Sequence, residues 1–179
     1  MDKIDCELLV MTYGSLVTQL LADHPTDICL VNKQLDSMGR NIGSRLIDEF
    51  LARSSHKCTG FKDVSESVRS AFTMFLGISP TITHSLPPPP TANSALVEPK
   101  MFSVVFDENP LAEFVELPES AAGLWFSNVY CGVIRGALEQ LNIVVECVFV
   151  SDVLNGDATT EISVTLVRTL DDEGPVNDE

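Results

Sequence analysis

Hydrophobic positions in the first half of the chain recur at steps of three and four residues, the spacing of one helix face. This pattern predicts helices over about residues 9–23, 31–53 and 64–77. Pro25 ends the first helix, because the residue before a proline disfavours helical geometry, and Gly77 suits a left-handed C-cap. The core-facing stripes are expected at Leu9, Tyr13, Leu16, Val17, Leu20 and Leu21; at Val31, Leu35, Met38, Ile42, Leu46 and Phe50; and at Val64, Val68, Ala71, Phe72, Phe75 and Leu76.

The second half of the chain contains apolar and alternating runs that are typical of strands. Residues 101–106 form one such run, with 81–84 as a candidate partner, and two more runs cover 143–150 and 161–170. Asn155-Gly156-Asp157 lies between the last two runs and is a strong hairpin signal. An antiparallel sheet is therefore expected.

A fourth helix is predicted over about residues 122–141. The predicted fold class is α+β, with four main helices packed on a small twisted antiparallel sheet. Residues 1–170 are expected to form a single domain that contains a proline-rich loop at 84–100. The stretch 171–179 has five acidic and no basic residues, which predicts a disordered tail.

Composition narrows the functional classes. The 179 residues are 45% hydrophobic, enough for a sizeable core, and carry 11 basic against 26 acidic side chains, for a net charge of −15. This charge argues against nucleic acid as a partner and against direct attraction to anionic lipid. No signal peptide and no membrane span are evident. The five cysteines form no Cys-x-x-Cys pair, which favours reduced thiols in the cytosol and no metal site.

Two predicted helices contain Gly-x-x-x-Gly, at Gly39 with Gly43 and at Gly132 with Gly136. Each glycine costs about 1 kcal/mol of helix propensity relative to alanine, so a close backbone approach must compensate. Packing between helices of one domain explains the pattern most simply. A dimer face and a narrow tunnel for an apolar ligand are the alternatives.

Cys58 follows the second predicted helix, in the segment Ser54-Ser55-His56-Lys57-Cys58. The neighbouring Lys57 and His56 would favour its thiolate. A nucleophilic role would also need a histidine at hydrogen-bonding distance and an oxyanion site, and the sequence shows neither. No phosphate-binding loop and no paired-carboxylate arrangement is evident. The sequence therefore predicts no catalytic residue.

Five segments of the chain resemble the Bet-three subunit family of the TRAPP vesicle-tethering complex. The resemblance lies in Thr12–Leu20, Gly39–Arg53, Asn109–Pro118, Cys131–Glu139 and Gly156–Ile162. The segments occur in order and span roughly residues 7–170, so the match is far more specific than one short motif.

The resemblance implies an α+β fold and dimerisation through helices, either with itself or with homologous subunits. It also implies membership of a complex that tethers vesicles between endoplasmic reticulum and Golgi and catalyses nucleotide exchange on a Rab GTPase. Cys58 matches a family cysteine that carries a fatty acyl thioester, a palmitate-like covalent cofactor. The acyl chain occupies a buried apolar channel in the family, and Ala71 matches a small residue on it, with Phe75 one turn further along the same helix.

The expectation is therefore a non-enzymatic scaffold subunit, cytoplasmic and peripheral at Golgi and endoplasmic reticulum membranes, whose membrane contact is indirect. A soluble carrier of a non-covalent fatty acid or other apolar ligand shares the channel and is the alternative. A thiol enzyme that uses Cys58 is a third hypothesis.

Overall fold

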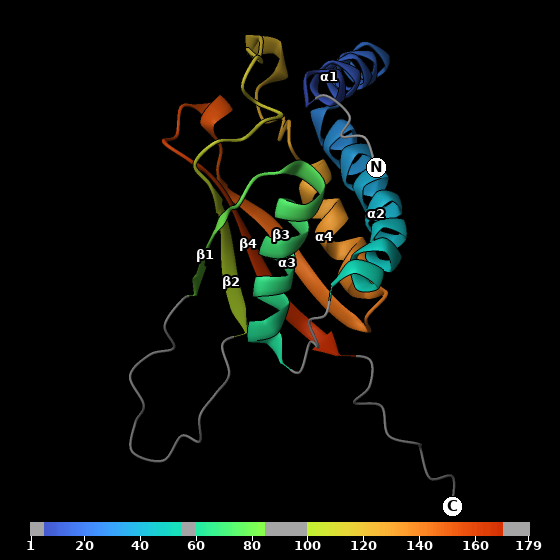
Figure 1. The fold of residues 1–179 in the computed structure, drawn as a ribbon. Helices are drawn as coiled ribbons and strands as arrows, with labels where there is room; N and C mark the ends of the chain where they lie inside the picture. The colour runs from blue at the N-terminus through green and yellow to red at the C-terminus, as the bar shows by residue number, and fades with distance from the viewer. Residues whose placement is uncertain (1–5, 55–59, 85–99, 170–179) are drawn as a thin grey trace, which may run out of the picture.

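The computed structural model describes residues 6–54, 60–84 and 100–169, and shows one layer of helices on one sheet (Figure 1). The predicted proline-rich loop and the predicted acidic tail lie outside these ranges, apart from the loop's end residues His84 and Lys100. The helices are α1 (Cys6–Asp23), α2 (Ile28–Arg53), α3 (Phe61–Leu76) and α4 (Val129–Glu139), and the strands are β1 (Thr81–His84), β2 (Met101–Phe106), β3 (Ile143–Ser151) and β4 (Thr160–Thr169). The predicted α+β class is confirmed.

The four strands form one antiparallel sheet in the order β1-β2-β4-β3. Residues 81–84 pair with β2, as predicted. The β3–β4 connection contains the expected turn, in which Gly156 has φ 93°. It is longer than a two-residue hairpin, because a 3₁₀ turn at Val153–Asn155 precedes this glycine.

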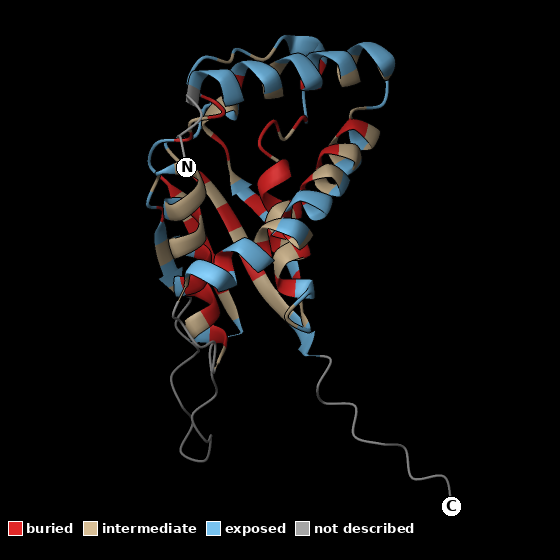
Figure 2. Ribbon diagram, turned by 45° about the vertical axis from the view of Figure 1, so that its right-hand side comes forward, coloured by how far each residue is buried: buried red, intermediate tan, exposed pale blue. Residues whose placement is uncertain are grey.

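Alternation along the strands places apolar side chains on the face that the helices cover. Phe102 and Val104 of β2 and Ile162 and Val164 of β4 are fully buried there, whereas Val167 at the end of β4 is exposed. Figure 2 shows the buried positions between the helices and the sheet. This one-sided burial is usual for an antiparallel sheet.

The Gly-x-x-x-Gly motifs lie at the contact between α2 and α4. A Cβ added at Gly39 would lie 2.9 Å from the Cα of Gly132, and one added at Gly43 would lie 2.9 Å from the nitrogen of Ala137. Real Cβ atoms do not approach backbone this closely. The glycines therefore serve packing between two helices of one domain, the simplest of the three interpretations.

The predicted core stripe of α2 is wrong in its middle. Gly39, Gly43 and Ile47 are buried instead of Met38, Ile42 and Leu46. Glycine adds nothing to a hydrophobic pattern, yet the close approach to α4 turns the glycine face inward. The larger apolar side chains therefore lie on a second, partly exposed stripe.

The predicted core-facing stripe of α1 is also partly wrong. Val10 and Val17 are buried, but Leu9 and Leu16 are 41% and 37% exposed. Only the side of α1 that carries Val10, Tyr13 and Val17 is covered. Tyr13 on that side packs edge-on against Phe126 and donates a hydrogen bond to its carbonyl oxygen.

The fourth helix begins at Val129, seven residues later than predicted. Asn32 of α2 explains the difference, because it binds the backbone of the preceding segment. Its Nδ2 donates to the carbonyl of Gly123 at 2.9 Å, and its Oδ1 accepts from the nitrogen of Trp125 at 2.9 Å. Gly123, with φ 85°, also breaks helical geometry.

Candidate functional site

Helix α3 supplies the two predicted channel residues that the structure describes. Its core-facing side is aromatic: Phe61 packs on Phe102 and Phe72 packs edge-on against both Phe106 and Tyr130, with ring centroids 5.0–5.3 Å apart. These contacts fix the rotation of α3 about its axis. Every other side chain of the helix then has a defined direction.

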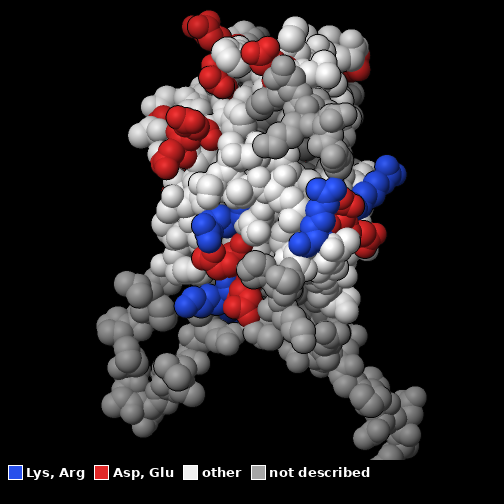
Figure 3. Space-filling model, in the orientation of Figure 1, with Lys and Arg blue, Asp and Glu red and all other residues white. Residues whose placement is uncertain are grey.

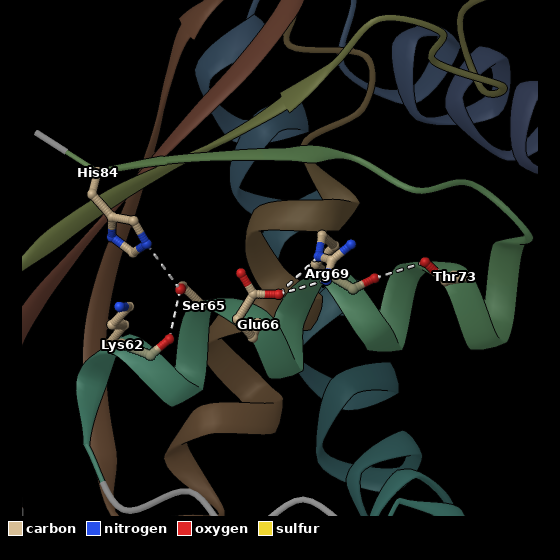
Figure 4. Close-up of polar contacts among 6 residues, drawn as sticks. All are labelled: Lys62, Ser65, Glu66, Arg69, Thr73 and His84. Atoms are coloured by element: carbon tan, nitrogen blue, oxygen red, sulfur yellow. Dashed lines mark hydrogen bonds and ion pairs between the residues drawn. The ribbon is translucent and has the colours of Figure 1, made fainter.

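One flank of α3 is polar and faces β1 and solvent (Figure 4). The Ser65 hydroxyl donates to the carbonyl of Lys62 at 2.7 Å, and Ser65 Oγ lies 3.4 Å from Nε2 of His84 on β1. Arg69 binds one carboxylate oxygen of Glu66 through two nitrogens at 2.7 and 2.9 Å. The polar groups of this side are thereby used within the fold.

Ala71 and Phe75 lie on the opposite flank. Ala71 is six residues beyond Ser65, which places the two side chains about 120° apart around the helix axis. Both Ala71 and Phe75 are partly buried and share a stripe with Val64 and Val68, which are buried. This stripe is turned away from the side of α3 on which Ser65 meets His84 of β1.

The predicted attachment residue, Cys58, lies outside the described residues, as does His56. The chain is described up to Ser54 at the end of α2 and again from Gly60, the N-cap of α3. In the sequence, the Cys58 segment therefore directly precedes the helix that carries Ala71 and Phe75. The continuous apolar channel between them stays a prediction.

Two other cysteines are buried and unreactive in character. Burial raises the pKa of the Cys147 thiol to about 12, and it holds the pKa of Cys131 well above the ordinary value. Both thiols are free and remain protonated near neutral pH. Neither has the properties of a nucleophile or a thiolate metal ligand.

The described residues contain no group of three or more His, Cys, Asp or Glu side chains that could hold a metal ion. Within the same residues, no helix is long and apolar enough to cross a membrane.

His84, the last residue of β1, borders the proline-rich segment in the sequence and meets a side chain of α3 in the fold. His84 is partly buried, and the side chain it meets, Ser65, is fully buried. The Ser65 hydroxyl and Nε2 of His84 thus form a polar contact between α3 and β1. The sequence held no signal for this pair, since the two residues lie on different elements and 19 positions apart.

The chain is similar in sequence to known proteins. The profile of the family described as Transport protein particle (TRAPP) component matches residues 9–165. The chain is 46% identical over 181 residues to Transport protein particle subunit bet3 of Schizosaccharomyces pombe, covering 99% of this chain and 92% of that protein. It is 45% identical to Trafficking protein particle complex subunit BET3 of Saccharomyces cerevisiae, covering 99% and 89%.

A solved structure is similar as well. It is the crystal structure of a trafficking protein particle complex subunit 3 from Naegleria fowleri covalently bound to palmitic acid. The similarity has a TM-score of 0.81 and 46% sequence identity, and it covers 94% of this chain and 98% of that one.

Proposed function

Because the chain belongs to the TRAPP component family, we propose that it is a non-enzymatic core subunit of the vesicle-tethering complex. The observation that carries this proposal is the family match over residues 9–165 together with identity above 40% to Bet3 subunits along almost the whole chain. The subunit serves transport between endoplasmic reticulum and Golgi and contributes scaffold to nucleotide exchange on a Rab GTPase. It is cytoplasmic and peripheral at both membranes.

In this proposal Cys58 carries a palmitate-like acyl group as a thioester. The acyl group runs along the stripe of Ala71 and Phe75. The covalent palmitate of the Naegleria relative supports the modification. The partly buried apolar flank of α3 supports the route. Burying some fourteen methylenes would contribute roughly 11 kcal/mol at about 0.8 kcal/mol each. An acyl chain buried in this way stabilises the fold and is not free to anchor the protein in a bilayer.

The partner surface of this subunit is helical. The apolar side chains of α1 that face solvent are Leu8, Leu9, Met11 and Leu16. Three of them are more than 40% exposed, and Met11 is 71% exposed. Scattered exposed residues need no explanation, but four within nine residues of one helix favour a protein interface.

Helix α2 adds a second part to this surface. Ile42 is 45% exposed, and Asn41, Ile42, Arg45 and Leu46 line a surface hollow of about 460 Å³. A hollow with an apolar wall can receive a side chain of a partner. The chain therefore dimerises through the outer faces of α1 and α2, with a second copy or a homologous TRAPP subunit.

The net charge of −15 makes direct binding to nucleic acid or anionic lipid unfavourable. Contact with the membrane is therefore indirect, through other subunits of the complex.

The decisive experiment is an intact mass of the purified protein before and after hydroxylamine. The expected result is an added mass of one acyl group that hydroxylamine removes and that Cys58→Ser never acquires. Cys29 is an exposed free cysteine. Cys29→Ser is therefore the matched control, and this variant keeps the added mass.

The same samples separate the alternative, a soluble carrier of a non-covalent fatty acid. Organic extraction removes a carried lipid and leaves a thioester in place. A protein of unmodified mass that loses a fatty acid on extraction would contradict acylation and favour the carrier.

A further inference from the structure

The segment between β2 and α4 presents an exposed aromatic side chain. Phe114 is 71% exposed, whereas two residues just before it, Leu111 and Ala112, are 2% and 7% exposed. The chain is thus anchored in the core within two residues of Phe114. The exposure belongs to a fixed position in the fold and not to a chain end.

Hydrogen bonds hold this turn in one conformation. The buried Asn109 donates from Nδ2 to Ser127 Oγ at 2.8 Å, and its Oδ1 accepts from the nitrogen of Leu111 at 3.2 Å. Its carbonyl accepts from the nitrogen of Ala112 at 2.9 Å. A rigid turn that presents a large apolar ring loses little conformational entropy on binding, which is the property of a binding anchor.

Acidic residues flank Phe114 along the chain. All five carboxylates of the segment are exposed: Asp107, Glu108, Glu113, Glu116 and Glu119. Among the described residues none of them forms an ion pair with a basic side chain. The sequence has no Lys or Arg between Lys100 and Arg135. Figure 3 shows acidic side chains at the end of the molecule where this loop lies in Figure 1, and the basic ones away from it.

Charge decides what can cover the ring. A second copy docking symmetrically would bring carboxylates against carboxylates, and nucleic acids and anionic lipids would be repelled. We infer that Phe114 and its acidic border dock a different protein, one that offers an apolar pocket rimmed by lysine or arginine. This surface is separate in sequence from the α1 and α2 dimer face. The inference rests on the proposed function only in that the partner is sought within the assembled complex.

A photo-crosslinker tests the contact directly. The complex is assembled from co-expressed subunits with p-benzoylphenylalanine at position 114, or at position 42 on the dimer face, and the crosslinked peptides are sequenced by mass spectrometry. The expected result at 114 is a peptide from another subunit with Lys or Arg within a few residues of the crosslink. A crosslink at 114 only to a second copy of this chain, or none, overturns the docking surface. Absence of crosslinks at both positions contradicts the proposed function as well.

Substitutions then test the chemistry with the crosslinked subunit as the probe. Phe114→Ala is expected to weaken its binding about 30-fold or more, and Phe114→Tyr to retain most of it. Glu113→Lys with Glu116→Lys weakens binding and reduces its salt dependence. Val167→Ala, at an exposed position of β4, is the control and leaves binding unchanged. Equal binding by Phe114→Ala and the unaltered chain would overturn the inference.

Discussion

Gly39 of α2 and Gly132 of α4 lie against each other so closely that neither position has room for a Cβ. A Cβ on Gly39 would be 2.9 Å from the Cα of Gly132, and the reverse distance is 2.8 Å. The neighbouring atoms are backbone, which cannot move aside without separating the helices. The register of the two helices therefore depends on these two residues.

Gly39→Ala is expected to destabilise the protein by about 1–3 kcal/mol, in spite of the gain in helix propensity. Gly14→Ala is the matched control, because it also lies inside a helix but a Cβ there meets nothing within 4 Å. That control should gain up to about 1 kcal/mol. Urea unfolding at one protein concentration measures both. Equal effects of the two substitutions would contradict the close approach of α2 to α4.

Ala71→Leu is expected to exclude the acyl chain, because the larger side chain fills the route beside Phe75. Thr73→Leu introduces the same side chain on the exposed side of the same helix and serves as control. Intact mass before and after hydroxylamine measures the acylated fraction of each variant. If Ala71→Leu were acylated as fully as the unaltered chain, the channel would lie elsewhere.

Ile42→Asp is expected to weaken dimerisation at least about tenfold, since it places a charge in the hollow on α2. Ser37→Asp introduces the same charge at an exposed position of α2 outside the Met38–Ile42–Leu46 stripe. Sedimentation velocity over a range of protein concentrations measures the dissociation constants. A chain that is already monomeric at micromolar concentration, or that tolerates both substitutions, would rule out this face.

Asp152 makes stability depend on pH. Burial raises its pKa above the ordinary value of 3.8, and its Oδ2 has no hydrogen-bond partner in the described structure. The folded state therefore holds the proton more tightly than the unfolded state. The stability that this proton contributes is fully present below pH 3.8 and is lost as the pH rises through the raised pKa.

Asp152→Asn removes this titration, so the unaltered protein should lose stability relative to the variant as the pH rises from about 4 to 7. Asp107→Asn removes one exposed carboxylate and controls for net charge. Denaturant unfolding at several pH values measures the differences. A difference between Asp152→Asn and the unaltered chain that does not change with pH would contradict this account.

The sequence indicated some residues of the candidate site, and the structure was needed to orient the helix that carries them. The sequence pointed to Cys58 and Ala71 through motifs that resemble a known family. The sequence could not orient α3, because the apolar positions of this helix occupy a broad face. The aromatic contacts of Phe72 with Phe106 and Tyr130 fix that orientation, and with it the flank on which Ala71 and Phe75 lie.

The sequence by itself determined the succession of elements, the pairing of 81–84 with β2, the glycine that ends α3 and the turn before β4. These follow from local geometry: periodicity, left-handed glycines and alternation. Only the tertiary structure decided which stripe of α2 is buried and where α4 begins. The reason is that both depend on contacts distant in sequence, the glycine faces of α2 and α4 and the bonds of Asn32 to the segment before α4. A hydrophobic pattern records only apolar side chains, whereas these contacts join backbone to backbone or backbone to a polar side chain.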